Sequence, residues 1–359
     1  MNLAHKLRYV LLTTVVWLAY PDNVQAAVVL QYHHISASTP ASTSTSPERF
    51  AMHLAYLSDH GFDVVPLETL VSRLRSGQPL PDKTVAITFD DGYRSIYDTA
   101  FPMLRERGWP FTVFVNSEPH DRKQPSFMTW EQLREMSRHG ATIANHTVSH
   151  TSLIERDPGQ PEAAWREWIA GEIKTAQQRI EQETGSTVKM LAYPYGEYNE
   201  AVLEVADQLG FTGFGQQSGP LADTSDLRVL PRFPFGGSYG DESDFATKVN
   251  SLPMPLASGA AAIRREDGAG EQLFDIVFAE SGVRPVLRLS FETGFDTGRI
   301  NCFVSGQGRV PVTVQGSSIL VRAERGLGPG RSRYNCTAPS AQAGRYFWYS
   351  QLWIVQPSP

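Results

Sequence analysis

The chain has 359 residues, of which 41% are hydrophobic and 19% are charged, and its formal net charge is −6. This length is typical of two domains, and the composition is that of a globular protein with enough apolar residues for a core. The negative charge gives no support to nucleic-acid binding, which normally needs a basic surface. The functional signal must therefore come from local motifs.

The first 26 residues are typical of a secretory signal peptide. Lys6 and Arg8 give a basic start, and the stretch from Tyr9 to Tyr20 is uncharged and mostly apolar. A membrane-spanning helix needs about 20 residues, so we expect no stable membrane span, although an uncleaved anchor helix is the alternative. Small residues before Ala27 suit cleavage after Ala26. We therefore expect an exported protein, in the periplasm or outside the cell.

From residue 27 to residue 252, short apolar runs alternate with helical patterns. The runs that predict strands are 28–32, 85–89, 111–115, 141–144, 190–193 and 211–214. Helical periodicity lies between them, over about 47–75 with a break at Gly61, and over 95–107, 130–139, 165–180 and 200–209. Such alternation predicts parallel strands, in an open sheet or in a (β/α) barrel, with functional groups at the carboxyl ends of the strands.

The C-terminal part of the sequence has a different character. Residues 253–270 are rich in Ala, Gly, Pro and charge, and we expect them to be a linker. Residues 271–359 predict an all-β sandwich of about seven strands. Cys302 and Cys336 are the only cysteines, and in an exported chain they predict a disulfide. The aromatic residues over 346–353 form either a sugar-binding surface or part of the core.

Two adjacent carboxylates, Asp90 and Asp91, directly follow the apolar run 85–89. Neighbouring carboxylates repel each other and are costly to remove from water, so a buried pair needs a positive partner such as a metal ion. Because the two side chains diverge in an extended segment, one can bind metal while the other faces substrate. The alternative is that an Asp caps the helix that follows.

Two histidines four residues apart, His146 and His150, come after the run 141–144. Neutral imidazoles at this spacing can bind one ion, and Asp91 would complete three ligands and leave a position open, as in catalytic sites. The turn Tyr-Pro-Tyr-Gly, which contains Tyr195, follows the next predicted strand. A backbone N–H of this turn can point into the site, or the segment is an ordinary turn.

In this order, Thr-Phe-Asp-Asp-Gly (88–92), His-Thr-x-x-His (146–150) and Tyr-Pro-Tyr-Gly (193–196) resemble the motifs of nodulation-type polysaccharide deacetylases, carbohydrate esterase family 4. The resemblance covers roughly residues 28–250. The opening Leu-Gln-Tyr-His-His-Ile (30–35) resembles the branch that deacetylates poly-β-1,6-N-acetylglucosamine of biofilms, in which the motifs are circularly permuted. The resemblance implies a distorted (β/α) barrel deacetylase domain over 27–252 that removes N-acetyl groups from such a polysaccharide.

The resemblance also implies a role for each motif residue. The metal, Zn²⁺ by default with Co²⁺ or Ni²⁺ as alternatives, would be held by Asp91, His146 and His150. Asp90 would be the general base that takes a proton from the attacking water. His33 would be the general acid for the leaving amine, with His34 as the competing candidate. The backbone N–H of Tyr195 would stabilise the oxyanion.

The sequence departs from this family at two places. Leu191 and Ala192 stand where an Arg usually precedes Pro-Tyr, and the usual Asp-Trp motif is not evident. Arg232 is expected to substitute by pairing with Asp90, as an Arg in such a segment does in the biofilm branch. The alternative is that Arg232 lies on a solvated loop.

The sequence motifs leave other functions open. The same chemistry could act on peptidoglycan, chitin oligomers or O-acetylated xylan, and a non-catalytic polysaccharide-binding protein is a further alternative. Retention of the complete set of acidic and imidazole motif residues argues against a binder, since drift would be expected to erase at least one. A nuclease or phosphatase is not supported, because the sequence has no second carboxylate cluster and no basic phosphate clamp. The expected partner is a polysaccharide.

Overall fold

The computed structural model describes residues 25–264, 271–272, 276–278 and 281–356. The predicted signal peptide lies almost entirely outside these residues, and its predicted cleavage point directly precedes the first strand. Within the described ranges, no helix has the length and apolar character that crossing a membrane requires.

Eight parallel strands form the first sheet, in the order β10-β1-β5-β6-β7-β8-β9, with β4 paired to β5. Their bounds are β1 (Ala27–Tyr32), β4 (Asp63–Val64), β5 (Thr84–Phe89), β6 (Phe111–Val115), β7 (Ala141–Asn145), β8 (Met190–Ala192), β9 (Thr212–Phe214) and β10 (Phe233–Pro234). A bridge from Phe214 to Leu230 joins β9 to the segment that leads into β10, so the sheet nearly closes on itself. The prediction of a distorted (β/α) barrel is confirmed.

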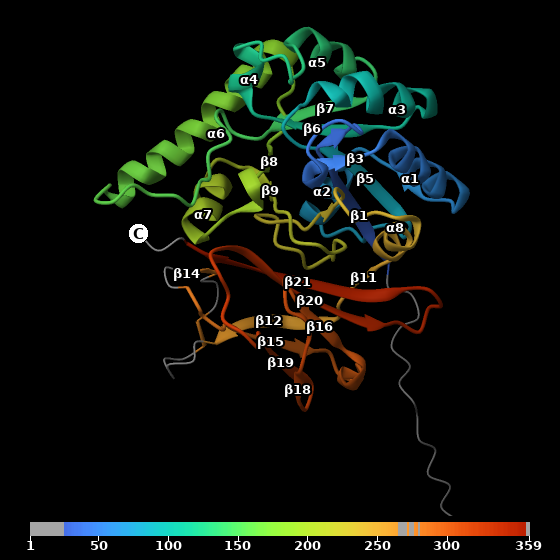
Figure 1. Ribbon diagram of the computed structural model, residues 1–359, viewed down its shortest axis with the longest axis vertical. Helices are drawn as coiled ribbons and strands as arrows, with labels where there is room; N and C mark the ends of the chain where they lie inside the picture. Colours follow the sequence, from blue (N-terminus) through green and yellow to red (C-terminus); the bar gives the residue numbers. More distant parts are fainter. Residues whose placement is uncertain (1–24, 265–270, 273–275, 279–280, 357–359) are drawn as a thin grey trace, which may run out of the picture.

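Helices connect the strands and cover the outside of this sheet (Figure 1). They are α1 (Pro47–Asp59), α2 (Leu67–Arg75), α3 (Phe101–Arg107), α4 (Ser117–Asp121), α5 (Trp130–Ser137), α6 (Glu162–Thr184), α7 (Glu200–Gln208) and α8 (Glu242–Val249). The helix predicted over 95–107 begins with a π-helical turn, η2 (Ile96–Ala100), and α8 was not predicted. A short pair of strands, β2 (His34–Ile35) and β3 (Ser44–Thr45), follows β1.

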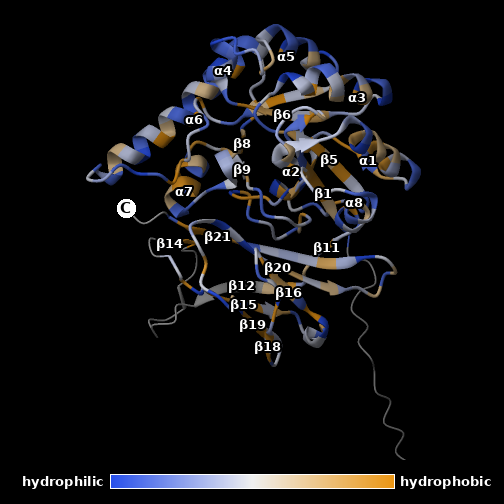
Figure 2. Cartoon of the chain, viewed as in Figure 1, coloured by the Kyte–Doolittle hydropathy of each residue, from blue (hydrophilic) through white to orange (hydrophobic). Residues whose placement is uncertain are grey.

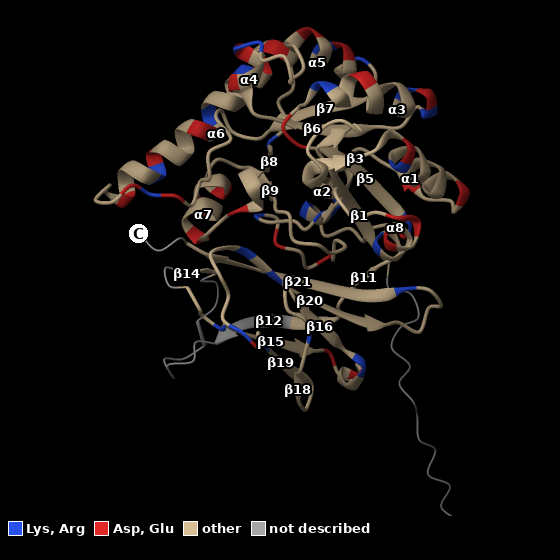
Figure 3. Cartoon of the chain, in the orientation of Figure 1, with Lys and Arg blue, Asp and Glu red and all other residues tan. Residues whose placement is uncertain are grey.

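Apolar periodicity explains how the helices dock. In α6, Trp165, Ile169, Ile173 and Ile180 follow one another at intervals of four, four and seven residues on one face, and all four are buried. Figure 2 shows apolar residues concentrated on strands such as β1 and β5, with hydrophilic residues on outer helices such as α4 and α5. Figure 3 shows the charged residues on the same outer helices. Burial of apolar area, at about 25 cal/mol per Å², is what fixes the helices on the sheet.

The C-terminal part forms two further sheets, in the orders β11-β21-β20-β16-β17, with β14 on β21, and β13-β12-β15-β19-β18. Their strands are β11 (Leu252–Pro253), β12 (Leu256–Arg264), β13 (Glu271–Gln272), β14 (Val277–Phe278), β15 (Val286–Phe291), β16 (Asn301–Val304), β17 (Gly308–Val310), β18 (Val312–Gln315), β19 (Ser318–Arg322), β20 (Gly330–Pro339) and β21 (Tyr346–Val355). Leu287 and Val321 of one sheet share a core cluster with Cys336 and Trp353 of the other. The prediction of a C-terminal all-β region is confirmed.

The start of this region differs from the prediction. Strand β12 occupies part of the expected linker 253–270, and it pairs with β15 through Ala261 opposite Leu289. Residues 265–270 of that linker lie outside the described residues. The sheets also hold more strands than the seven predicted, and β20 is one of those that were missed. Its buried residues Tyr334, Cys336 and Ala338 alternate with less buried ones, so period two was present in the sequence.

Cys302 and Cys336 form a disulfide, as predicted, and they are directly paired on neighbouring strands β16 and β20. Many of the C-terminal aromatic residues belong to the core, since Trp353 is 0% exposed and Phe347 is also buried. Tyr346, in contrast, is 42% exposed. Carbohydrate binding by the C-terminal sheets stays a prediction.

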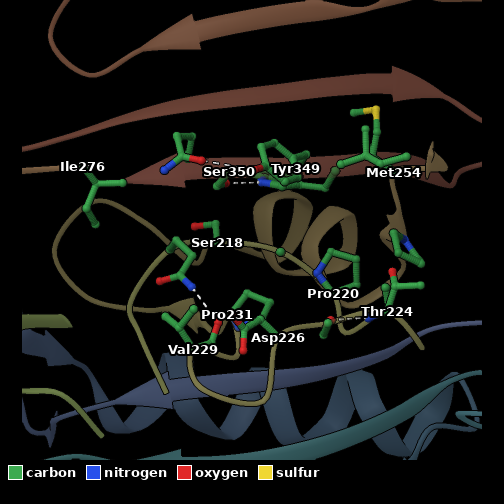
Figure 4. A pocket seen from close by; sticks show the side chains of 18 of the residues that line it. Ser218, Pro220, Thr224, Asp226, Val229, Pro231, Met254, Ile276, Tyr349 and Ser350 are labelled. Atoms are coloured by element: carbon green, nitrogen blue, oxygen red, sulfur yellow. Dashed lines mark hydrogen bonds between the residues drawn. The ribbon is translucent and has the colours of Figure 1, made fainter. Parts of the chain in front are cut away.

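The long strand β21 packs along the barrel domain (Figure 1). Arg345 makes two hydrogen bonds of 2.8 and 2.9 Å to the carboxylate of Asp82, and the ring of Trp348 stands edge-on to Phe233 at 5.3 Å. A cavity of about 320 Å³ lies along this contact, between β21 and residues 217–231 (Figure 4). Its lining includes none of the residues predicted to carry chemistry.

Candidate metal centre

The predicted site residues lie at the carboxyl ends of neighbouring strands. Asp90 and Asp91 follow β5, His146 follows β7, and Tyr195 lies in the turn η3 (Pro194–Gly196) directly after β8. Because β5, β6, β7 and β8 are adjacent and parallel, these four chain positions meet at one edge of the sheet. Strand order, rather than sequence distance, brings them together.

Asp91, His146 and His150 converge on one point. The carboxylate oxygen Oδ1 of Asp91 lies 3.3 Å from Nε2 of His146 and 3.2 Å from Nε2 of His150. One potential ligand atom from each of the three residues lies within 4.8 Å of the other two. Asp91 and His146 are buried, whereas the side chain of His150 is 23% exposed. The geometry is that of a site open on one side.

The hydrogen bonds around these residues suit a cation. Nδ1 of His146 lies 2.7 Å from the carbonyl oxygen of Ala192, which can only accept, so Nδ1 carries the proton and Nε2 presents a lone pair. Nε2 of His146 and Oδ1 of Asp91 are both buried without a hydrogen-bond partner. Two facing buried acceptors repel each other unless a positive charge lies between them. Two imidazole nitrogens and a carboxylate therefore fit a divalent transition metal.

The backbone of the site is held in an unusual conformation. Left-handed φ values occur at Asp91 (70°), Thr147 (70°), His150 (59°) and Tyr195 (60°), which are four of the six such non-glycine residues in the described part of the chain. Each costs about 1–3 kcal/mol and persists only where surrounding contacts hold it. The concentration of this strain around one point is typical of a functional site.

The loop between His146 and His150 is held by Glu172, which belongs to no motif of the sequence. Oε2 of Glu172 accepts hydrogen bonds of 3.1 and 3.0 Å from the backbone N–H groups of Val148 and Ser149. Glu172 lies on α6 and is not among the buried residues of that helix. A glutamate at such a position is common, so the sequence gives no indication of this role. Only the docking of α6 beside β7 reveals it.

Asp90 lies next to the three converging residues, in a fully buried ion pair. Arg232 donates two hydrogen bonds, of 2.7 and 2.8 Å, to its two carboxylate oxygens, and Nε2 of Gln31 donates a third at 2.6 Å. Asp90 and Arg232 are each 0% exposed. Arg232 therefore lies in the core beside Asp90 and not on a solvated loop, while Gln31 was not anticipated.

Electrostatics keep both carboxylates charged. Burial raises the pKa of Asp90, but Arg232 and then His146 and His33 lower it, and the net pKa is below its ordinary value. Burial likewise raises the pKa of Asp91, and the neighbouring imidazoles of His146, His33 and His150 bring it well below its usual range. Both groups are therefore ionised at neutral pH.

The two imidazoles respond in opposite directions. Burial lowers the pKa of His146, but Asp91 and Asp90 raise it, and the net shift is upward. Burial and the charge of His146 lower the pKa of His150 to about 4. The pKa of His146 is raised because the two buried carboxylates are stabilised by a positive charge beside them. Either a proton on His146 or a metal ion can supply that charge.

His33 and His34 are placed differently. His33 is half-buried, and its charge acts on Asp90, Asp91 and His150. His34 is stacked on Tyr93 with ring centres 3.7 Å apart, and burial lowers its pKa. The charge of Asp91 also acts on His34, so which of the two exchanges a proton at the centre stays a prediction.

Tyr195 borders the open side of the site. Its ring stands edge-on to that of His150 at 4.6 Å, and the side chain is 42% exposed. Its φ of 60° and ψ of 1° make η3 an irregular turn, in which Pro194 restricts the preceding backbone. The fixed turn confirms the structural part of the expectation, and the oxyanion role of the N–H stays a prediction.

Comparison with known proteins agrees with this geometry. The sequence profile described as polysaccharide deacetylase matches residues 77–214. The Bacillus subtilis protein YxkH, whose name describes a polysaccharide deacetylase, is 31% identical over 205 residues, which are 57% of this chain and 69% of that protein. The poly-β-1,6-N-acetyl-D-glucosamine N-deacetylase of Escherichia coli is 28% identical over 250 residues, and the match spans 59% of this chain but only 37% of that protein.

A solved structure shows the same fold. The deacetylase PplD of Streptococcus pyogenes, in complex with acetate, superimposes with a TM-score of 0.55 at 23% identity, covering 61% of this chain and 96% of that chain. His33 and Arg232 lie outside the segment that matches the family profile. The roles expected of these two residues therefore draw no support from that profile.

Proposed function

The chain belongs to the polysaccharide deacetylase family, and we propose that it hydrolyses N-acetyl groups of a poly-β-1,6-N-acetylglucosamine-like exopolysaccharide. The observation that carries the proposal is the convergence of Asp91, His146 and His150, with buried acceptor atoms that lack partners. The match to an E. coli enzyme named for this polymer supports the substrate class.

Asp91, His146 and His150 would hold the divalent cation, with Zn²⁺ as the first expectation and Co²⁺ or Ni²⁺ as alternatives. When bound, such a cation supplies Lewis acidity, which polarises a carbonyl group and lowers the pKa of water to about 7. His146 is oriented for this task by Ala192, whose carbonyl fixes the tautomer.

Asp90 would accept the proton of the attacking water. An ionised carboxylate offers about four lone-pair positions, and Arg232 and Gln31 occupy three of them, two on Oδ2 and one on Oδ1. One position on Oδ1 is left for a water molecule. The ion pair with Arg232 keeps Asp90 ionised and fixes its orientation, so that the base does not need to reorganise during the reaction.

His33 would donate a proton to the leaving amine. The water oxygen adds to the carbonyl carbon while one of its protons passes to Asp90, and the C=O bond opens to an oxyanion. The oxyanion then forms the C=O bond again as the C–N bond breaks, and the nitrogen takes a proton from His33. Tyr195 would donate its backbone N–H to the oxygen that becomes negative, where one such donor is worth about 3–4 kcal/mol in known enzymes. Acetate and a free amine are the products.

We also propose that the protein is exported, to the periplasm or the cell exterior. The disulfide between Cys302 and Cys336 supports this, because disulfides persist in oxidising compartments. Mass spectrometry of the mature N-terminus, with cleavage after Ala26 as the expected result, tests it.

The test of the proposed function is turnover of defined oligomers. The purified protein is incubated with N-acetylglucosamine oligomers of β-1,6 and of β-1,4 linkage and with O-acetylated xylan, and the mass loss per acetyl group is followed. We expect loss from the β-1,6 oligomers first. Dialysis against a chelator should abolish it, and Zn²⁺, Co²⁺ or Ni²⁺ should restore it.

Two controls separate the alternatives. Asp91→Asn keeps the volume of the side chain and should remove turnover whatever metal is added. A non-catalytic binder would instead retain its affinity for the polymer after chelation and release no acetate. Faster deacetylation of the β-1,4 oligomers or of the xylan would contradict the proposed substrate while leaving the reaction type in place.

A further inference from the structure

A side chain of the C-terminal sheets reaches the turn that carries Tyr195. Arg331, near the start of β20, donates a hydrogen bond to the backbone carbonyl oxygen of Tyr195. Its guanidinium carbon lies 5.8 Å from the centre of the Tyr195 ring, and its Nε lies 3.5 Å from Oε1 of Glu197. One arginine, 136 residues away in sequence, thus contacts the backbone, the ring and the neighbouring carboxylate of this turn.

Glu197 extends the contact to the histidine loop. Its second oxygen, Oε2, accepts a hydrogen bond of 2.5 Å from Oγ of Ser152, two residues beyond His150. The ring of Tyr195 meets that of His150 at 4.6 Å. Arg331 and Glu197 therefore tie together two loops of the metal centre, the one after β7 and the one after β8. The side chain of Glu197 is only 16% exposed, so solvent screens this contact only partly.

The backbone of Tyr195 needs such support. A left-handed φ of 60° is unfavourable for a residue with a Cβ, and the turn would relax if its contacts were removed. A hydrogen bond to the carbonyl oxygen fixes the peptide plane that follows Cα, and a contact with the ring fixes the side chain. With both fixed, little freedom remains for the direction of the N–H of the same residue.

We propose that Arg331 is a positioning residue for deacetylation, which holds the turn at Tyr195 so that its N–H points at the developing oxyanion. This inference rests on the proposed function. It makes the C-terminal sheets part of the catalytic unit, because the barrel domain alone lacks the guanidinium that holds this turn. Hydrogen bonds that act on charge developing in the transition state raise kcat and change KM little.

The experiment compares four full-length variants: Arg331→Ala, Arg331→Lys, Glu197→Gln and, as matched control, Arg345→Ala. The control also removes an arginine that joins the C-terminal sheets to the barrel, through Asp82, but it touches no residue of the metal centre. kcat and KM are measured on β-1,6-linked N-acetylglucosamine oligomers with saturating Zn²⁺. Hydrogen–deuterium exchange of the backbone over residues 193–198 is measured on the same samples.

We expect Arg331→Ala to lower kcat by about tenfold or more with KM within about twofold, since removal of one oxyanion donor costs about 10²–10³ in kcat. Arg331→Lys should recover part of the lost kcat. The kcat of Glu197→Gln should lie between those of Arg331→Ala and the wild type. Exchange over 193–198 should rise in Arg331→Ala and stay unchanged in Arg345→Ala.

Wild-type kcat in Arg331→Ala, or an equal loss of kcat in Arg345→Ala, would overturn the positioning role. If the wild-type protein releases no acetate from any oligomer, the proposed function fails. Hydrogen–deuterium exchange then still decides whether Arg331 holds the turn. Unchanged exchange over residues 193–198 in Arg331→Ala would show that it does not.

Discussion

Arg232 and Asp90, which are each 0% exposed, form two parallel hydrogen bonds of 2.7 and 2.8 Å. The two residues are 142 positions apart, and Arg232 also donates to the carbonyl oxygen of Gly215 at 2.9 Å. A fully buried charge is tolerated only where the opposite charge and hydrogen bonds compensate the loss of water. The pair therefore has to be retained or removed as a unit.

Replacing Arg232 alone should be strongly destabilising. Arg232→Met leaves the carboxylate of Asp90 buried without its counter-ion, and we expect the free energy of unfolding to fall by about 3–5 kcal/mol. The double variant Arg232→Met with Asp90→Asn should recover much of this loss while remaining inactive. Urea unfolding of the two single variants and the double variant measures the coupling. Additive losses in this cycle would show that the two side chains do not stabilise each other.

Metal affinity should depend on pH through a single proton. The raised pKa of His146 means that the metal-free site holds a proton there at pH values below that raised pKa, and the metal must displace it. His150, with a pKa of about 4, is already neutral at pH 6, and Asp91 is already ionised. The dissociation constant for Zn²⁺ should therefore rise about tenfold per unit as the pH falls below the pKa of His146. Competition with a chromophoric chelator between pH 5 and pH 8 measures this slope, and a flat profile or a two-proton slope would contradict it.

The two adjacent histidines should differ in their effect on turnover. His33→Asn should lower kcat by about 10²–10⁴, the usual contribution of a general acid, because its imidazole acts on both carboxylates of the centre. His34→Asn should change kcat less, because the contacts of the His34 ring are structural. The ring is stacked on Tyr93, and its Nδ1 lies 3.4 Å from Oγ of Ser95. Steady-state kinetics on the same oligomers decides between them. The reverse order of effects would assign the acid role to His34.

Gly92, directly after the two aspartates, should tolerate no side chain. Its φ is 77°, and a Cβ there would come within 2.7 Å of Cε1 and Nε2 of His120. Gly92→Ala should therefore displace Asp91, weaken metal binding and destabilise the fold by more than the backbone strain of about 1–3 kcal/mol.

Gly61→Ala is the matched control for this prediction. Gly61 has a similar φ of 68°, but no atom lies within 4 Å of the position that its Cβ would take. It should show the cost of backbone strain without loss of metal affinity. Thermal unfolding and Zn²⁺ titration of both variants test the comparison. Equal losses of stability and of metal affinity in the two variants would show that the clash with His120 has no effect of its own.

The sequence determined the regular elements of the barrel and the candidate metal ligands. Apolar runs bounded by turns locate β5, β7 and β8 to within one or two residues, because a buried parallel strand must be apolar on both faces. The polar residues that interrupt those runs at their carboxyl ends, Asp91 and His146, stand out for the same reason. The spacing of His146 and His150 was likewise visible without coordinates.

Tertiary structure alone decided the surroundings of these residues. The pairing of Arg232 with Asp90 was expected only through the family resemblance, and nothing in the sequence shows that Glu172 holds the loop after His146 or that Arg331 of β20 contacts Tyr195. These contacts join segments that are 24 to 142 residues apart. Secondary structure follows from periodicity along the chain, whereas long-range partners depend on how whole elements pack, and packing is set by the shape of the complete core.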